Sequence, residues 1–375
     1  MADSNRARRL RVAGALTAGG AMVAAGLAAS PTVAEPDADR GGPAPFTVVV
    51  DGLDNPRQMH LLGNGTVIVA EAGHGSYKAG NCDGGLCIGR TGKIGRLKGG
   101  GYKQKVTGLL SFASADGTFA AGADGVARRK PGKLMPVMTY APPQAIPSGT
   151  KGKRQLGKLL INRPKGSKSV LADISRFEER FDPDGEGVDS NPYAGLGLKN
   201  KTLVADAAGD YIAAVRPKGK VELWATMPEY GKRVDAVPTV ITRAGNGAIL
   251  VGELHSEQPN QAKVLVFNRG GERVNAYRGF TSVTGVARTK DGTLYVSELF
   301  SGCGPGAPPN CTPGRVIRVE PDGDRSRLKV PFPAGIVARG DRVLVAAWSI
   351  APKNGAFGGG AQTSGQIRKL NFDAR

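Results

Sequence analysis

Four acidic residues stand at corresponding points of a repeated pattern in this 375-residue chain. Each closes a short apolar run and precedes a loop: Glu71 follows VIVA, Asp206 follows LVA, Glu253 follows ILVG and Glu298 follows LYVS. Carboxylates brought together from several loops could bind Ca²⁺, which takes several oxygen ligands. An acid at the end of a strand also commonly accepts hydrogen bonds from backbone N–H groups of the following turn. The pattern therefore leaves two interpretations open, a shared metal site and local capping of the loops.

Four further polar residues lie near the same points of the pattern. His74 and His255 come just after two of the acids, whereas Arg57 and Tyr193 each follow an Asn-Pro turn. A guanidinium and a phenol at the mouth of a channel would suit an anionic or sugar-like ligand, although both could equally be exposed rim residues. With the four acids, these residues form the set of candidate ligand-binding groups.

The elements that must position these groups repeat about every 45 residues, a spacing typical of propeller blades. Four copies begin at Leu53, Asp189, Asp235 and Thr281. Each contains a turn, an apolar strand, a polar turn, a second strand that ends in an acid, and two more alternating strands. Four antiparallel strands make one blade. Because matching loops of a propeller meet on one face, the four acids should gather around a central channel.

Two more copies are irregular. Residues 114–175 supply strands around a Pro-rich excursion, and Leu171, Ile174, Phe177 and Phe181 then follow helical spacing, which predicts a short amphipathic helix. The last copy begins at Pro333, places Trp348 where the other copies have an acid, and is one strand short. The segment 46–50 has no partner before the first blade. The sequence thus predicts an all-β, six-bladed propeller over residues 46–375, closed by its N-terminal strand in the C-terminal blade.

The first 34 residues read as an export signal. Four arginines, including the pair Arg8-Arg9, precede an apolar Ala/Gly-rich run and a small-residue stretch. The pair permits twin-arginine export, and the run is short for a membrane anchor, which is the alternative. Residues 35–45 are a Pro-rich linker. We therefore expect a secreted protein without a transmembrane anchor.

The four cysteines form two local pairs, Cys82 with Cys87 and Cys303 with Cys311. In an oxidising compartment, near neighbours in Gly/Pro-rich loops predict two loop disulfides. A zinc site is the alternative, but it would require tighter and more His-rich spacing.

The chain is strongly basic, with a net charge of +19 that falls to about +16 when the signal segment is removed. Outside a cell this charge favours anionic partners such as envelope polymers, or it serves solubility alone. No run of basic residues is interleaved with aromatics, so specific nucleic-acid binding is not expected. The protein is expected to be a monomer.

The units NPRQMHLLGNGTVIVAEAG and TGVARTKDGTLYVSEL resemble NHL-type propeller repeats. More narrowly, LDNPR at Leu53, LADISRFE at Leu171, VDSNPY at Val188 and LVADAAGD at Leu203 resemble the ScyD/ScyE family of secreted propellers. This resemblance spans nearly the whole chain after the signal. It implies export and a propeller fold, and it implies no particular reaction.

The sequence favours a binding or scaffold protein that recognises a small polar or glycan-like ligand at the channel face. The alternative is a calcium-dependent hydrolase or lactonase of the gluconolactonase-like type, although the asparagine ligands expected of that group are not evident. The chain contains no nucleophile elbow, no HExxH motif and no P-loop. No cofactor is assured; Ca²⁺ is the candidate.

Overall fold

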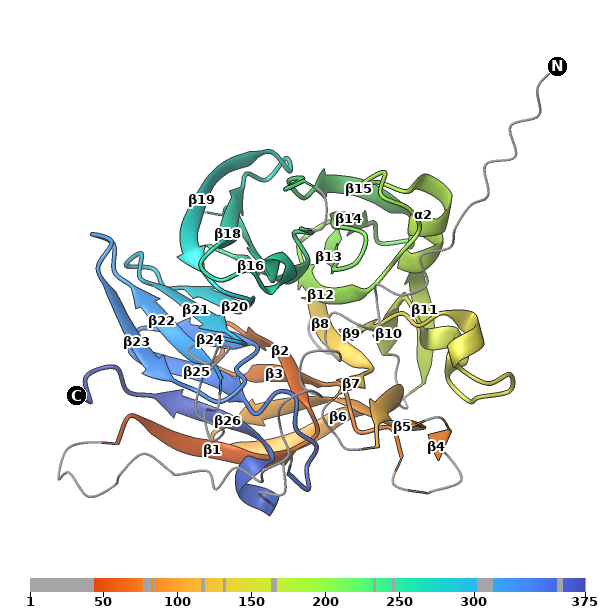
Figure 1. Ribbon diagram of the computed structural model, residues 1–375, viewed down its shortest axis with the longest axis horizontal. Coiled ribbons are helices and arrows are strands. Elements are labelled where there is room, and N and C mark those ends of the chain that lie inside the picture. The colour runs from red at the N-terminus through yellow and green to blue at the C-terminus, as the bar shows by residue number, and fades with distance from the viewer. Residues whose placement is uncertain are drawn as a thin grey trace.

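Alternating apolar residues form six antiparallel sheets that stand around one axis, as the ring of arrows in Figure 1 shows. The computed structural model describes residues 44–374, apart from gaps at 77, 79–81, 84, 116–118, 131–132, 163–166, 232–233, 245–246, 302–312 and 356–359. The predicted six-bladed β-propeller is confirmed.

Each blade runs from an inner strand at the axis to an outer strand at the rim. The first blade contains β2 (Pro56–Leu61), β3 (Val67–Glu71), β5 (Leu86–Lys98) and β6 (Gly101–Ser114), with the short β4 (Cys82–Asp83) and β7 (Ala120–Ala121), and the second contains β8 (Ala123–Lys130), β9 (Lys133–Met138), β10 (Lys158–Asn162) and β11 (Lys168–Asp173). The third contains β12 (Pro192–Gly197), β13 (Thr202–Asp206), β14 (Tyr211–Val215) and β15 (Val221–Thr226), and the fourth contains β16 (Pro238–Arg243), β17 (Ile249–Glu253), β18 (Ala262–Phe267) and β19 (Arg273–Phe280). The fifth contains β20 (Val283–Arg288), β21 (Leu294–Glu298), β22 (Arg315–Val319) and β23 (Arg325–Lys329), and the sixth contains β24 (Ile336–Arg339), β25 (Arg342–Ala347), β26 (Gly365–Leu370) and the first strand of the chain, β1 (Phe46–Leu53).

The ring closes through the first strand of the described chain, as expected from the missing strand of the last copy. β1 pairs antiparallel with β26, with Phe46 opposite Leu370 and Thr47 opposite Lys369. The two strands lie side by side near the bottom of Figure 1, where the colours of the two chain ends meet. Pairing the two ends removes the longest exposed sheet edges, which is why a ring is favoured over an open array.

The core lies between neighbouring blades. One cluster joins Leu203 and Ile212 of the third blade to Ile241, Val251 and Leu265 of the fourth, and all five side chains are buried. Valine and isoleucine suit this position because strands that are covered on both faces carry near-continuous apolar runs. The rigid stack of sheets fixes where the loops at its two ends must emerge.

A single α-helix among the described residues, α2 (Ile174–Phe181), follows the second blade. Its N-cap Asp173 accepts a hydrogen bond from the backbone N–H of Arg176. The prediction of a helix here is confirmed, but Leu171 was wrongly assigned to it. Leu171 belongs to β11, because the outer strand of the blade continues to Asp173 before the helix begins. Short 3₁₀ turns occupy Pro143–Ala145, Lys153–Gln155, His255–Glu257 and Gly360–Thr363.

Cys82 of β4 and Cys87, the second residue of β5, form the expected disulfide in the first blade. Cys303 and Cys311 lie outside the described residues, as do the predicted export signal and most of the predicted linker. None of the helices in the described part of the chain is both long and apolar enough to cross a membrane.

Candidate functional site

The inner strands β2, β8, β12, β16, β20 and β24 surround the axis, and Gln58 of β2 reaches across it. Its side-chain amide donates to the backbone carbonyls of Thr239 in the fourth blade and Thr284 in the fifth, at 2.8 and 2.9 Å. The Thr284 hydroxyl continues the connection by donating to the carbonyl of Pro333 in the sixth blade, at 2.7 Å. These bonds join blades that are far apart in sequence, so the side chains at the axis serve to hold the ring together.

Arg57, the residue before Gln58, forms a buried clasp instead of an open ligand-binding group. Only 7% of the residue is exposed. Its guanidinium donates to the carbonyls of Ser349 and Ala120, the latter at 2.6 Å, and lies 3.5 Å from the Asp124 carboxylate. One side chain thus joins the first blade to the second and sixth.

Asp124 is the partner that the sequence did not single out. Burial raises the pKa of this carboxyl to about 6, and the charge of Arg57 and the hydroxyl of Thr139 only partly oppose that rise. Tyr193 is affected by the charges of both residues. Burial raises its pKa to about 12, the charge of Arg57 opposes this rise, and the charge of Asp124 adds to it. The candidates Arg57 of the first blade and Tyr193 of the third are therefore near enough to influence each other, and Asp124 lies on the second blade, between these two blades.

A sequence signal for Asp124 does exist. It is the second residue of its inner strand, as Arg57 and Tyr193 are in theirs. The missing Asn-Pro turn in the irregular second blade hid this correspondence.

The four strand-end acids are all completely buried. Three of them accept a hydrogen bond from a backbone N–H in the loop that precedes the inner strand of the same blade: Glu71 from Asp54 at 2.8 Å, Asp206 from Asn191 at 2.5 Å, and Glu298 from Thr281 at 2.8 Å. Among the described residues, Asp206 alone also accepts from its own following turn, through the N–H groups of Ala208 and Gly209. The carboxylates thus act as local caps, and most of their donors come from the preceding loop instead of the following turn that we expected.

The third strand of each of these blades supplies a second partner. Lys93 lies directly opposite Glu71 in the sheet, Tyr211 opposite Asp206, and Arg315 opposite Glu298. The Lys93 ammonium lies 3.4 Å from Glu71, and the Arg315 guanidinium bonds to Glu298. These partners compensate much of the cost of burying a carboxylate.

His74 completes a second network beside Glu71. Its Nδ1 lies 3.0 Å from Asp54, whose other carboxylate oxygen is 2.5 Å from the Lys93 ammonium. Burial opposes ionisation of Asp54, but His74 and Lys93 outweigh it and lower its pKa to about 2. Asp54 and Lys93 thus form an ion pair inside the protein, which is typical of a structural role.

Glu253 differs from the other three acids. The Tyr230 hydroxyl donates to its Oε1 at 2.6 Å, whereas Oε2 has no hydrogen-bond partner in the described part of the chain and lies 3.7 Å from His255 Nδ1. The Lys263 ammonium lies 3.7 Å above the Tyr230 ring. Burial raises the pKa of Glu253 to about 7 and lowers that of His255. The mouth of the fourth blade therefore holds a buried acid whose pKa lies near neutrality.

The four acids do not come together as a metal site. In the residues that the structure describes, one group of three or more candidate ligands has its atoms within 4.8 Å of one another, and it consists of Glu178, Asp182 and Asp184 beside α2. The expectation of Ca²⁺ at the channel mouth thus receives no support from the positions of these carboxylates.

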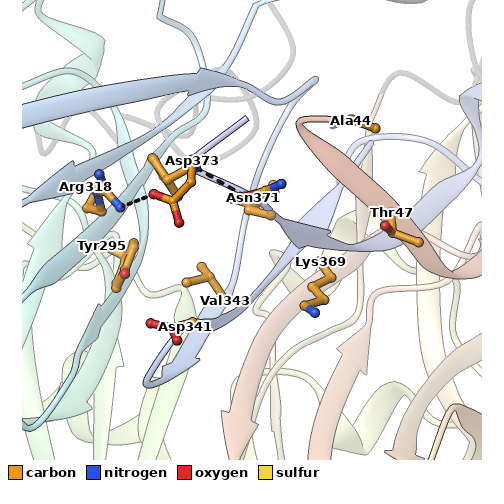
Figure 2. Close-up of a pocket in the computed structure, with 11 residues that line it drawn as sticks. Ala44, Thr47, Tyr295, Arg318, Asp341, Val343, Lys369, Asn371 and Asp373 are labelled. Carbon is orange, nitrogen blue, oxygen red and sulfur yellow. Dashed lines mark hydrogen bonds and ion pairs between the residues drawn. The ribbon is translucent and has the colours of Figure 1, made fainter. Parts of the chain in front are cut away.

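A cavity of about 320 Å³ lies away from the channel mouth, where the fifth and sixth blades meet the closing strand. Figure 2 shows Arg318, Asp341, Lys369 and Asp373 around it, with Tyr295 on one side. The Arg318 guanidinium lies 3.4 Å from the Asp373 carboxylate and 5.1 Å from the centre of the Phe372 ring. None of the sequence candidates lines this cavity, because it is created by the seam between β1, β26 and the fifth blade.

No protein-family model matches the chain, and no curated protein sequence is significantly similar to it. Solved structures share its fold at low sequence identity. A luciferin-regenerating enzyme is 9% identical, with a TM-score of 0.51 over 87% of this chain and 95% of that one. Regucalcin, a calcium-binding protein from Agrobacterium tumefaciens, is 12% identical, with a TM-score of 0.50 over 88% and 95%. A streptogramin B lyase is 13% identical, with a TM-score of 0.48 over 87% and 97%. The first two similarities agree with the six-bladed propeller seen in the sheet order, and none of the three establishes the ScyD/ScyE assignment.

Proposed function

We propose that this propeller is an exported binding or scaffold protein that recognises a small polar or glycan-like ligand. The observation that carries the proposal is the internal use of the channel-mouth groups: Glu71, Asp206 and Glu298 are buried and bonded to loops of their own blades, and Arg57 is buried and bonded to the neighbouring blades. These hydrogen bonds hold the loops of the channel mouth in one rigid arrangement. The motif resemblance to secreted ScyD/ScyE propellers supports export.

The seam cavity is the better location for the ligand than the channel face. It offers an ammonium, a guanidinium and two carboxylates on its wall, and Lys369, Asp341 and Asp373 are exposed. A cavity of about 300 Å³ with a few convergent polar groups is typical of small-ligand sites. Donors and acceptors of both kinds suit the hydroxyl groups of a sugar.

The test is binding of two soluble probes by calorimetry, N-acetylglucosamine oligomers as a neutral glycan and galacturonic acid oligomers as an anionic polymer. We expect Asp341→Ala and Lys369→Ala each to weaken binding of the preferred probe at least fivefold, roughly the loss of one hydrogen bond. Lys133→Ala, which removes an exposed lysine at the start of β9, is the matched control. Binding that disappears with salt but is insensitive to the cavity variants would indicate attraction by net charge alone. Absence of binding to either probe would count against the cavity.

The calcium-dependent hydrolase remains a second candidate because of one observation, the pairing of Glu253 with His255. A carboxyl with a pKa near 7 is suited to general acid–base catalysis. The complete burial of Glu253 argues against this use, since a substrate would have to displace the Tyr230 side chain that donates to it. Hydrolysis of dihydrocoumarin in calcium buffer that is abolished by Glu253→Gln, with folding intact, would favour the enzyme over the binding protein.

A further inference from the structure

The loop that follows α2 carries a concentration of acids that the proposed function does not use. Asp182, Asp184 and Glu186 alternate along it, and Gly187 follows with a positive φ of 109°. Alternate acids followed by a glycine that makes a sharp turn resemble the first half of the calcium loop found in helix–loop–helix proteins, with Glu186 where that loop has Asp or Asn. Here too the loop begins directly after a helix.

Glu178, one turn before the end of α2, provides the independent observation. Its side chain is completely buried, yet neither carboxylate oxygen has a hydrogen-bond partner within the described chain. One carboxylate oxygen of Glu178 lies within 4.8 Å of a carboxylate oxygen of Asp182 and of Asp184. Two oxygens that both bind Ca²⁺ at about 2.4 Å can be at most about 4.8 Å apart, so the spacing fits one shared ion.

The surroundings of Glu178 offer no positive charge to compensate it. Within the described residues, no lysine, arginine or histidine forms an ion pair with Glu178, Asp182 or Asp184. Besides Asp182 and Asp184, the buried Asp206 adds negative charge near Glu178, and the backbone N–H of Asp189 lies close by without completing a hydrogen bond to the carboxylate. A buried carboxylate without a donor or a cation is costly, and a bound metal removes that cost.

The backbone keeps this space open. A Cβ atom on Gly209, in the loop between β13 and β14, would lie 2.8 Å from Glu178 Oε2. The Asp182 carboxylate accepts from the N–H of Gly187 at 3.1 Å, which folds the loop back over the end of the helix. The helix end, the loop and the third blade thus enclose the three carboxylates.

We propose that Glu178, Asp182 and Asp184 bind one Ca²⁺ ion at the rim of the propeller, between α2 and the third blade. Calcium is the cation that fits, because all three side-chain ligands are hard oxygens, one from the end of α2 and two from the loop that follows it. Zinc would be favoured by histidine or cysteine, and neither is among them. Backbone carbonyls and water would complete the coordination.

The ion would fix the segment that leads into the third blade. After the loop, Ser190 and the backbone N–H of Asn191 bond to Asp206, and the Asn191 side chain accepts from Thr139. Calcium binding at the rim would therefore also position Ser190 and Asn191, which bond to the Asp206 cap at the channel mouth. The proposal does not depend on the ligand of the seam cavity.

The experiment uses the mature chain after treatment with EDTA, titrated with CaCl₂ or MgCl₂ and followed by thermal melting. We expect Ca²⁺ at 10 mM to raise Tm by roughly 2–6 °C, with a dissociation constant of about 10⁻⁴ M, as in extracellular calcium modules. Mg²⁺ should bind at least tenfold more weakly, because it requires stricter octahedral geometry. Terbium luminescence, excited through tyrosine, supplies a second readout, since the Tyr211 ring and Glu178 both lie against Gly209.

Glu178→Gln and Asp184→Asn should each weaken calcium binding at least tenfold and abolish the terbium signal. Glu179→Gln is the matched control, because Glu179 is the neighbouring glutamate on the exposed side of the same helix. Asp184 is only half-buried, so Asp184→Asn keeps the test valid if Glu178→Gln fails to fold. Wild-type protein without a calcium response, or a response that persists in both variants, would overturn the proposal. A response lost only in Glu71→Gln would move the ion to the channel mouth.

Discussion

Glu71 and Glu178 are both completely buried glutamates, but their surroundings are opposite. Glu71 receives the N–H of Asp54, the hydroxyl of Tyr102 and the ammonium of Lys93. Glu178 has no hydrogen-bond partner among the described residues and faces Asp182, Asp184 and the charge of Asp206. Burial alone, or a position at a strand end, therefore does not tell a structural cap from a candidate cation site. The hydrogen-bond donors around the buried acid do.

The largest effect should come from breaking the frame at the axis. Arg57→Ala leaves Asp124 buried without its cation and leaves the carbonyls of Ser349 and Ala120 without their donor. We expect a loss of about 4 kcal/mol in the free energy of unfolding, measured by urea denaturation. Arg154→Ala, at an exposed arginine, should change it by less than about 0.5 kcal/mol. An equally small loss in Arg57→Ala would mean that the clasp does not stabilise the ring.

The contrast between donor-rich and donor-poor acids is tested by one matched pair of variants. Asp206→Ala removes the acceptor of two hydroxyls and three backbone N–H groups and should cost about 3 kcal/mol. In EDTA, Glu178→Gln should cost nothing or should stabilise, because an amide of the same size replaces a buried carboxyl that has no hydrogen-bond donor and lies among other acids. Denaturation of both proteins under the same conditions decides the matter. A comparable loss in both would abolish the distinction between the two environments.

The pH dependence of stability should reveal the environment of Asp124. Its pKa rises from an ordinary 3.8 to about 6 on folding, so between pH 4 and 6 the unfolded chain has released a proton that the folded protein retains. Stability from this group is therefore full below pH 4 and is lost as the pH rises to 6. Asp124→Asn lacks this loss, so its stability relative to wild type should increase by up to about 3 kcal/mol from pH 4 to pH 7. A difference that is independent of pH would show that Asp124 is ionised throughout.

The blades and their closure could be predicted from the sequence because strand alternation and turn residues repeat in register. The four acids also lie at the strand ends where the repeat placed them. The contacts between blades could not be predicted. Gln58 bonds to Thr239 across the axis and Arg57 of the first blade bonds to Ser349 of the sixth, and such contacts depend on the radius of the ring. Leu171 fits helical spacing and strand alternation equally, so only the pairing of β11 with β10 decided its place.

The smallest predicted effect compares two tyrosines that donate to strand-end glutamates. Tyr102→Phe removes one of three groups that bond to Glu71, whereas Tyr230→Phe removes the only side-chain hydrogen bond found for Glu253 in the described chain. Losing one of several partners should cost about 1 kcal/mol, and losing the sole one about 2 kcal/mol. Urea denaturation at pH 8, where both acids are closer to full ionisation, measures the difference. Should Tyr102→Phe prove the more damaging, the fourth blade would hold its acid by contacts other than this hydroxyl, and Glu253 would lose its standing as the least secured of the four.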